Sequence, residues 1–490
     1  MKKQKTKFQL RAADGAAIIS AVLFYLGFGL HPLPFLTWFI LLPLLVVAPR
    51  ISARRTAVLS VIAGVLGQIG VAIYFAGTLQ MPPALLVTLI AYLAAVMAGA
   101  VLLGRLFFVR RQPLLAVLAV ASAWVAGEYL LTILAPHGAW WSLGYSQSSV
   151  LPLLQIVSIT GVWGLSFLLT AFPAALAGMA LPDATFRSRI KIGVAIVGVA
   201  AVVGIFGAAR LHQTNVSPKL RLATAVAAEP SDEVEIGTPA GKDVLAGYQK
   251  YMQRLAAQHV HAVVFSEKGL RADQKQLADI TAPLAATSRQ YDITAVVGVM
   301  VQTAPETYEN RAIVITPNQG ETTYVKQHLI PGLEGDFDKG DKLAFVPGTN
   351  DTQGVIICKD LDFQAFARSY RQAGASVLLA PAWDFNNDGW LHSRIAITRG
   401  VEDGMAIVRT GRDGQLTISD AQGRVLAEHA ARENIASDIV ADVPNETPPT
   451  LYTKVGDWLA YVSIAFTLGS VGYLLKSYAS AAQGRTTRRQ

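Results

Sequence analysis

Long uninterrupted runs of apolar residues dominate the first 210 positions of the chain and recur once near its C-terminus. They lie at about 15–30, 33–49, 56–77, 84–108, 113–135, 160–182, 190–210 and 455–475. Each run is close to the length that a helix needs to cross roughly 30 Å of hydrocarbon. Buried helices of a soluble protein would rarely produce so many runs in succession. The pattern therefore predicts an α-helical membrane bundle of about eight transmembrane helices.

The pattern changes near residue 219, where short β-rich runs alternate with polar stretches of helical composition. Such alternation is typical of an α/β domain whose strands are covered on both faces. The expected strands lie at 220–228, 261–267, 292–301, 311–317, 355–360, 375–381 and 405–410, and the expected helices near 240–258, 272–289, 363–373 and 391–403. We therefore expect a membrane domain of seven helices at 1–211, an α/β domain at 212–450, and a last membrane helix with a basic tail at 451–490.

The charge balance follows the same division. Charged residues make up 16% of the chain, against roughly a quarter in soluble proteins. The net charge is +8, yet residues 212–454 hold 23 basic and 30 acidic side chains. The positive excess therefore belongs to the membrane segments. Because no nucleic-acid-binding motif accompanies it, we expect no nucleic-acid partner.

Basic residues in alternate loops predict the orientation in the membrane. They gather before the first apolar run and near 50–55, 105–111, 187–191 and 485–489, whereas the loops at 78–83 and 136–159 contain none. Basic loops tend to stay in the cytoplasm. We therefore expect a multi-pass protein of the bacterial inner (cytoplasmic) membrane, with both termini cytoplasmic and the α/β domain on the periplasmic, outer side.

Three polar residues follow expected strands and suggest chemistry. Glu267 closes the run 261–267, Lys326 follows Tyr324 and Val325, and Cys358, the single cysteine, follows the apolar residues 355–357. Active sites gather at the carboxyl ends of strands in open α/β sheets. A carboxylate, an ammonium and a thiol together supply a base, an electrostatic stabiliser and a nucleophile. Taken alone, the cysteine is equally well explained as a small buried hydrophobe.

In this chain order, Glu267, Lys326 and Cys358 resemble the Glu-Lys-Cys triad of the nitrilase superfamily. Within it, nearly the full length of the chain is similar to the apolipoprotein N-acyltransferase family. The segment GYSQSSVLPLLQIVSITGVWGLSFLL (144–169) resembles that family's membrane stretch, and YVKQHLIP (324–331), Glu334 and Asn310 are further matches. The resemblance implies a nitrilase-like αββα sandwich joined to the membrane bundle.

The resemblance also implies roles for these residues. Glu267 would be the general base in both half-reactions, Lys326 the oxyanion stabiliser, and Cys358 the nucleophile that becomes a thioester. Glu334 would support Lys326 or the base. The donor would be a membrane phospholipid, and the acceptor the N-terminal amine of a diacylglyceryl-cysteine on an apolipoprotein. The cationic neighbour is expected to lower the pKa of the thiol.

Several positions depart from the family pattern. Lys359 and Asp360, which we expect to support catalysis, follow the cysteine where the family has an aromatic residue and a glutamate. The base lies in Ser266-Glu267-Lys268 in place of a P-E-T-like motif. A Q-G-N-like motif is absent after the first domain strand, and PAWDFNNDGW (381–390) replaces an S-N-D-x-W-like run.

These departures leave alternatives open. One is a membrane-anchored amidase, or an acyltransferase for another amine. Another is a non-catalytic binding or scaffold protein. A pore or transporter is disfavoured, because the apolar runs contain almost no charged residue besides Glu128.

Other residues allow two interpretations each. Glu128 lies inside an apolar run and is either functional or hydrated near the outer interface. Trp140 and Trp141 either line a lipid entry or, as is commoner, form an aromatic belt at the interface. His328 and His392 lack partners at zinc-like spacing, so we expect no metal and no cofactor, and a monomer. The candidate substrate-binding residues are Trp140, Tyr145, Trp383, Trp390 and Asn310.

Overall fold

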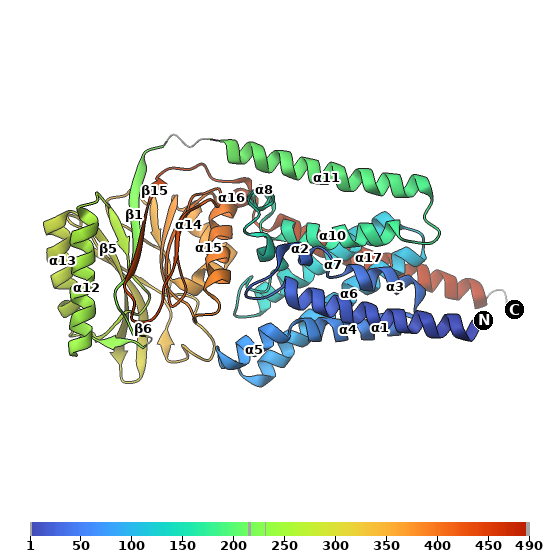
Figure 1. Cartoon of the computed structure of the whole chain (residues 1–490), viewed down its shortest axis with the longest axis horizontal. Helices are drawn as coiled ribbons and strands as arrows, with labels where there is room; N and C mark the ends of the chain where they lie inside the picture. Colours follow the sequence, from blue (N-terminus) through green and yellow to red (C-terminus); the bar gives the residue numbers. More distant parts are fainter. Residues whose placement is uncertain (1, 214–216, 231, 487–490) are drawn as a thin grey trace.

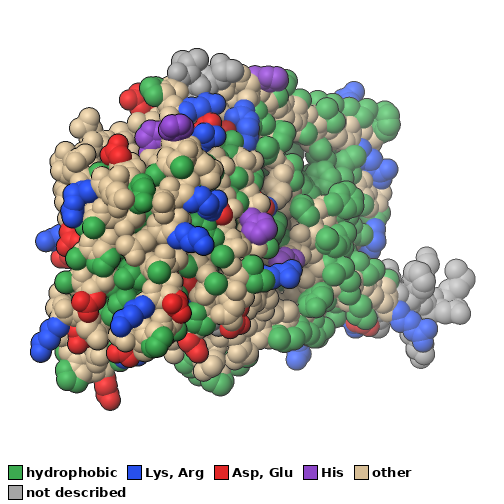
Figure 2. Space-filling model, turned by 60° about the vertical axis from the view of Figure 1, so that its left-hand side comes forward, with side chains coloured by type: hydrophobic (Ala, Val, Ile, Leu, Met, Phe, Trp, Pro, Cys, Tyr) green, Lys and Arg blue, Asp and Glu red, His purple; other side chains and the backbone are tan. Residues whose placement is uncertain are grey.

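The computed structural model describes residues 2–213, 217–230 and 232–486. It places a helical part beside a part built of two β-sheets, and the last helix returns to the helical part (Figure 1). Hydrophobic side chains gather over the helical part, whereas charged side chains are scattered over the other (Figure 2). Of the expected basic tail, Arg488 and Arg489 lie outside the described residues.

The helical part follows the apolar runs closely. Its long helices are α1 (Lys2–Gly27), α4 (Ala53–Gly67), α5 (Ile69–Gly77), α6 (Pro83–Val109), α7 (Pro113–Leu134), α10 (Trp163–Met179), α11 (Phe186–His212) and α17 (Trp458–Thr486). Short helices connect them: α2 (Pro34–Thr37), α3 (Leu42–Val47), η1 (Ala48–Arg50), η2 (Leu143–Gln147), α8 (Leu151–Leu154) and α9 (Val157–Thr160).

Four of the described helices are long and apolar enough to cross a membrane alone: α6, α7, α11 and the segment Trp458–Tyr478 of α17. The number rises to six if each bent pair is one span, namely α4 with α5, which bend by 47°, and Leu151–Thr160 with α10, which bend by 115°. The other two apolar runs correspond to α1 and to the shorter stretch Pro34–Arg50. A count of eight spans therefore stays a prediction.

Helix α11 lies along the edge of the helical part, where it contacts α8 and α10 (Figure 1). Only 11% of its most apolar window is buried, and Val194, Val197, Val202 and Ile205 are each at least two-thirds exposed. Such a surface is unfavourable in water but suits contact with lipid chains, because a helix satisfies its own backbone hydrogen bonds. The helix is therefore best explained as a lipid-facing membrane span.

The strands of the described residues form a nine-stranded and a six-stranded sheet. The first runs β15-β1-β3-β5-β4-β2, with β6 paired to β5, β7 and β8. The second runs β14-β13-β12-β11-β10-β9. Their bounds are β1 (Lys219–Val226), β2 (Val234–Glu235), β3 (Ala262–Val264), β4 (Leu270–Asp273), β5 (Thr294–Ala304), β6 (Thr307–Ile315), β7 (Glu321–Val325), β8 (Phe337–Asp338), β9 (Ala344–Phe345), β10 (Gln353–Val355), β11 (Val377–Trp383), β12 (Ala406–Arg412), β13 (Gln415–Ser419), β14 (Val425–Ala430) and β15 (Ser437–Pro444).

Alternate residues of each strand enter different cores, because successive side chains point to opposite faces. Val264 packs with Val355 and Leu379 between the two sheets. Val263, one residue earlier, packs instead under α12 (Pro239–Ala256) and α13 (Leu277–Tyr291). The six-stranded sheet is covered on its outer face by α14 (Gln364–Gln372) and α15 (Gly389–Asp403). Each sheet thus has helices on one face only, which gives the αββα sandwich that the resemblance implied.

Candidate active site

The three residues expected to form a triad lie just beyond strands, and all three are buried. Glu267 follows β3, Lys326 follows β7, and Cys358 follows β10 after Ile356 and Ile357. Strand β10 ends at Val355, so the expected strand at 355–360 is wrong beyond its first residue. Cys358 instead opens the 3-10 helix η3 (Cys358–Asp362). The site therefore combines residues from both sheets of the sandwich.

Lys326 lies between two carboxylates. Its Nζ donates to Glu267 Oε1 at 2.8 Å and to both carboxylate oxygens of Glu334 at 3.0 Å. Burial would lower the pKa of Lys326, but Glu267 and Glu334 outweigh it and hold that pKa well above its usual value. Burial would likewise raise the pKa of Glu334, yet Lys326 and Lys268 bring it down to about 2. The ammonium and the Glu334 carboxylate are therefore both charged at neutral pH.

Glu267 accepts three hydrogen bonds. Its Oε1 accepts from Lys326 Nζ and, at 2.7 Å, from Asn310 Nδ2, and its Oε2 accepts from the Trp383 backbone N–H at 3.0 Å. A carboxylate offers about four acceptor positions. One position on Oε2 is thus left to receive a proton from a nearby group. Asn310, expected to bind substrate, instead joins Glu267 to Glu334, to which it also donates at 3.1 Å.

Cys358 has a strained backbone, with φ of +41°. Non-glycine residues rarely adopt this region, and such strain concentrates at active sites. Its Sγ lies 3.8 Å from the Trp383 carbonyl oxygen. Burial raises the pKa of the thiol well above its usual value, Glu267 adds to the rise, and Lys326 and Arg409 only partly oppose it. Lys326 thus lowers the thiol pKa as expected, but its effect is outweighed, so a base must remove the proton.

Lys359 and Asp360 connect the η3 turn to its surroundings. Asp360 accepts from the Tyr324 hydroxyl at 2.6 Å and from the His328 backbone N–H at 2.8 Å, which ties the turn to both sides of Lys326. Lys359 Nζ lies 2.9 Å from His137 Nδ1, on the loop after α7. Asp360 thus links the segments carrying Lys326 and Cys358, and Lys359 links the turn to the helical part.

Of the candidate substrate-binding aromatic residues, Trp140, Tyr145 and Trp390 lie in one apolar cluster between the helices and the sandwich, whereas Trp383 lies at the triad. Trp383 contacts the site through its backbone, and its ring packs under the Arg412 guanidinium at 3.7 Å. Trp140 stacks on Tyr74 of α5, and the Tyr145 hydroxyl accepts from Arg399 of α15. Trp390 is half-buried near His31 and Arg394.

The tryptophan pair does not form an interfacial belt. Trp140 is 4% and Trp141 2% exposed, and both rings pack against Phe75. They fill the space between helices and sandwich, so the interpretation as a lipid-facing belt is wrong.

Glu128 is neither hydrated nor near open solvent. It is 2% exposed, and its carboxylate accepts from Trp124 Nε1, the Leu143 backbone N–H, Ser142 Oγ and Ser166 Oγ, at 2.7, 2.8, 3.1 and 2.6 Å. These donors come from α7, from the loop at 142–143 and from α10. Glu128 therefore holds the loop after α7 onto the helices, and its interpretation as a hydrated interfacial residue is wrong.

Two residues near the cysteine were not grouped with it in the sequence interpretation. A carboxylate oxygen of Asp384, a ring nitrogen of His392 and Cys358 Sγ all lie within 4.8 Å of one another. Asp384 is paired with Arg409 through both of its oxygens. Because that pairing occupies the carboxylate, we assign no metal to the cluster. Asp384 follows β11, so the strand-end argument that selected Cys358 could also have selected it.

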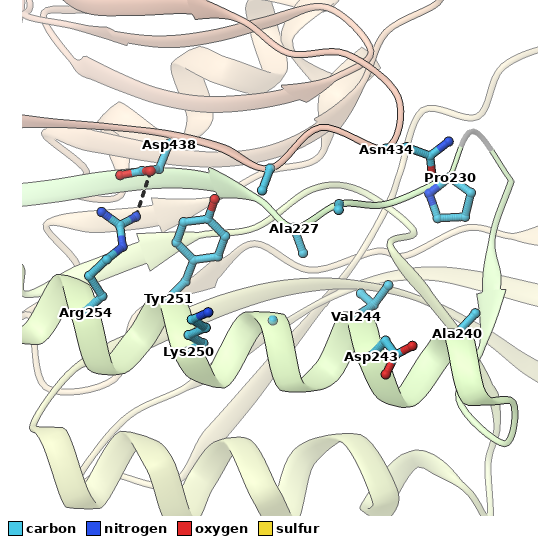
Figure 3. A pocket seen from close by; sticks show the side chains of 13 residues that line it. Ala227, Pro230, Ala240, Asp243, Val244, Lys250, Tyr251, Arg254, Asn434 and Asp438 are labelled. Carbon is cyan, nitrogen blue, oxygen red and sulfur yellow. Dashed lines mark ion pairs between the residues drawn. The ribbon is translucent and has the colours of Figure 1, made fainter.

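One groove on the sandwich is remote from this chemistry. It measures about 730 Å³ and lies over α12, where the Arg254–Asp438 ion pair closes one end (Figure 3). Neither Cys358 nor any other triad residue lines it. We therefore place the candidate active site at the buried triad.

Two families match different parts of the chain. Residues 20–175 match the apolipoprotein N-acyltransferase N-terminal domain, and residues 244–453 match the carbon-nitrogen hydrolase family. The second match contains all three triad residues. The first covers the helices that pack against the sandwich.

Curated relatives match most of the chain. An apolipoprotein N-acyltransferase from Geobacter metallireducens is 25% identical over 92% of both chains. Another from Rhodopseudomonas palustris is 25% identical over 79% of this chain and 78% of its own. Among solved structures, a carbon-nitrogen hydrolase from Helicobacter pylori has a TM-score of 0.39 at 15% identity, covering 46% of this chain and 89% of its own.

Proposed function

Because the chain belongs to the apolipoprotein N-acyltransferase family, we infer that it is a membrane enzyme that transfers an acyl chain to the N-terminal amine of apolipoproteins. We propose that the donor is a membrane phospholipid and the acceptor a diacylglyceryl-cysteine. The observation that carries the catalytic assignment is the convergence of Glu267, Lys326 and Cys358 from separate strands into one buried cluster. Both substrates are lipids, which explains a catalytic sandwich joined to membrane helices.

In the first half-reaction, Cys358 Sγ attacks the ester carbonyl of the phospholipid. The free position on Glu267 Oε2 accepts the thiol proton, which the raised pKa of Cys358 otherwise retains. Lys326, held charged by Glu267 and Glu334, stabilises the oxyanion that forms on the carbonyl oxygen. Glu267 passes the proton to the lysophospholipid oxygen as the C–O bond breaks, so that the lysophospholipid leaves as an alcohol and a thioester remains on Cys358.

In the second half-reaction, the amine of the acceptor attacks the thioester carbonyl. Glu267 takes a proton from the amine, Lys326 stabilises the oxyanion again, and Glu267 delivers the proton to the sulfur as the C–S bond breaks. Two chemical steps on one enzyme group produce ping-pong kinetics. Asn310 and Glu334 act as positioning residues, because they hold Glu267 and Lys326 in place.

The remaining features of the proposal concern the membrane. By the distribution of basic loops, both termini face the cytoplasm of the bacterial inner membrane and the sandwich lies on the periplasmic side. The protein acts as a monomer and uses no cofactor.

Intact-protein mass measurement tests the function. The purified protein is incubated with phosphatidylethanolamine, and then with a synthetic diacylated lipopeptide. We expect a mass gain of one acyl chain that is lost in Cys358→Ala, followed by a triacylated lipopeptide. An unmodified wild-type protein that yields no triacylated product contradicts the proposal, and release of free fatty acid without lipopeptide would assign the chain to the hydrolases instead.

A further inference from the structure

Another groove lies where the C-terminal end of α11 meets the sandwich (Figure 1). It measures about 1010 Å³ and is walled by the last turns of α11, by α9, by the loop between β13 and β14 and by the segment that enters α16 (Leu451–Val455). Gly404, which follows α15, also lines it, whereas Cys358 lies near His392 at the other end of that helix. A helix of this length spans roughly 22 Å. The groove is therefore separate from the candidate active site.

Two features indicate that this groove lies at the boundary of the hydrocarbon layer. The lipid-facing surface of α11 continues up to Ile205, which is 70% exposed, and Arg210 follows about 7.5 Å further along the helix. Trp458 is exposed at the start of the apolar helix α17, and its Nε1 donates to the Ile159 carbonyl in the groove wall at 2.8 Å. Tryptophan is enriched at the headgroup level of membranes. Lipid chains that lie against α11 therefore bring a headgroup to the groove.

The groove has an apolar wall that is incompletely covered by protein. Ile159 and Phe206 are half-buried in it, and Leu426 and Leu451 are 40% and 49% exposed. Exposed apolar patches with a polar rim mark sites of contact with a ligand, a protein or a membrane. An acyl chain in the groove would remove these side chains from water.

Two basic side chains of the groove lack an acid partner. The half-buried guanidinium of Arg210 donates to the Gln155 carbonyl over a long 3.4 Å, and Lys219 is exposed at the start of β1. Neither forms an ion pair within the part of the chain that the structure describes. Arginine has five N–H donors and lysine three. Most of these donors are therefore available to an anion.

The two acids that line the groove do not compensate these cations. Asp420 lies close enough to act on the charge of Arg210, but its carboxylate pairs with Arg424 at 2.8 Å and also accepts from two backbone N–H groups. Asp442 pairs with Arg221 at 3.3 Å. Each acid is thus neutralised by its own arginine, and the groove keeps an excess of positive charge.

We propose that this groove binds one phospholipid of net negative charge, apart from the acyl donor at Cys358. The phosphodiester accepts hydrogen bonds from Arg210 and Lys219, and the acyl chains lie along α11 and over Leu426 and Leu451. A zwitterionic lipid fits less well, because its own ammonium meets the same two cations. Since α11 is held mainly by α8 and α10, the bound lipid also bridges this helix and the sandwich.

Photolabelling with a lipid that cannot acylate Cys358 tests this site. The full-length protein in detergent receives a diether phosphatidylglycerol that carries a diazirine in one alkyl chain, and ether bonds offer no carbonyl to the thiol. We expect label on peptides that contain Ile159, Phe206 or Leu451. Unlabelled diether phosphatidylglycerol should compete about 30-fold better than the phosphatidylethanolamine analogue, because each basic side chain near an anionic lipid contributes about fivefold.

Three pairs of substitutions separate charge from structure. Arg210→Gln with Lys219→Gln should lower labelling of these peptides by about 30-fold at limiting lipid and remove the preference between headgroups. Arg210→Lys with Lys219→Arg keeps both charges and should keep both the label and the preference. Lys242→Gln with Arg289→Gln removes the same charge from exposed positions of α12 and α13 and should label like wild type.

Acylation distinguishes this site from the proposed function. All three variants should be acylated by ester phosphatidylglycerol within about twofold of the wild-type rate, since the groove is separated from Cys358 by the length of α15. Label that falls only outside the groove, undiminished labelling after loss of both cations, or equal competition by the two headgroups would overturn the proposal. Wild type that is labelled in the groove but never acylated would refute the proposed function and support the lipid site.

Discussion

Two buried residues of the site, Lys326 and Cys358, differ in whether they carry a charge. Lys326 is fully buried and still charged, because two carboxylates contact it directly. Cys358 is nearly as buried, but Glu267 opposes its ionisation and the cations only partly compensate. Burial therefore disfavours both charges, and the neighbouring carboxylates preserve that of Lys326 but oppose that of Cys358.

The suppressed ionisation of Cys358 predicts its reactivity toward small alkylating agents. Alkylation requires the thiolate, whose fraction rises about tenfold for each pH unit below the pKa. Because burial raises that pKa above its usual value, the rate with iodoacetamide should keep rising through pH 9. The chain has one cysteine, so total mass gain measures this site alone. A plateau near pH 7 would contradict a raised pKa.

Removing one carboxylate from Lys326 should slow catalysis without removing the nucleophile. In Glu334→Gln the ammonium keeps Glu267 as its single carboxylate partner and loses its orientation toward the oxyanion. We expect acylation by phosphatidylethanolamine to slow by about 10²-fold, measured as acyl-enzyme mass against time. Glu321→Gln, at an exposed position of β7, is the matched control. Equal acylation rates in the two variants would show that Glu334 does not contribute to catalysis.

At the scale of elements, the η3 turn is clamped by the loop after α7. The Ala139 backbone N–H donates to the Asp362 carbonyl at 2.9 Å, and Lys359 contacts His137. Gly138 makes this approach possible, since it has φ of +54° and an added Cβ would lie 2.4 Å from the Asp362 oxygen. The membrane part therefore helps to place the turn on which Cys358 sits.

Gly138→Ala should displace that turn. The new methyl group meets backbone and cannot be accommodated by a flexible side chain, and the positive φ disfavours alanine as well. We expect stability to fall by about 1–3 kcal/mol and acylation by at least tenfold, measured by thermal unfolding in detergent and by acyl-enzyme mass. Gly99→Ala, inside α6 with no atom within 4 Å of the added methyl, should not lose stability. Unchanged acylation in Gly138→Ala would show that the clamp is dispensable.

At the scale of the whole molecule, buried acids of α15 join the sandwich to the helices. Glu402 accepts from the Val162 backbone N–H at 2.7 Å, and Asp403 accepts from Thr453 Oγ1 at 3.1 Å. Burial raises the pKa of Glu402 to about 7 and, helped by Glu402, that of Asp403 to about 8. The junction between the two parts is thus most stable when these carboxyl groups are protonated.

This junction predicts a stability that falls as pH rises. Both pKa values are higher in the folded chain, so their contribution is complete below about pH 4 and is lost between there and about pH 8. Each pH unit over which one carboxyl is deprotonated only in the unfolded chain costs about 1.4 kcal/mol. Asp403→Asn should reduce this slope in thermal unfolding from pH 5 to 8.5. The exposed Asp442→Asn should keep it, and equal slopes in all three proteins would contradict the raised pKa of Asp403.

Much of the fold and the central residues of the site could be predicted from the amino-acid sequence. Each apolar run corresponds to helices, and the strand-end argument found Glu267, Lys326 and Cys358. The bends after α4 and before α10 were not predicted, because a bend changes direction without interrupting apolar composition. His392 was noticed but not placed near Cys358, since the 33 residues between them pass through β11 and the contact depends on how α15 packs.

The sequence by itself determined the division into membrane helices and an acidic domain. Helices that face lipid are apolar over their whole length, whereas a domain that folds in water alternates apolar and polar segments. It also determined which side chains could form a Glu-Lys-Cys triad. Only the tertiary structure decided the protonation of that triad, the interior position of Glu128 and Trp141, and the approach of His392 to Cys358. These properties depend on which elements exclude water and which charges meet, and both are set by packing between residues distant along the chain.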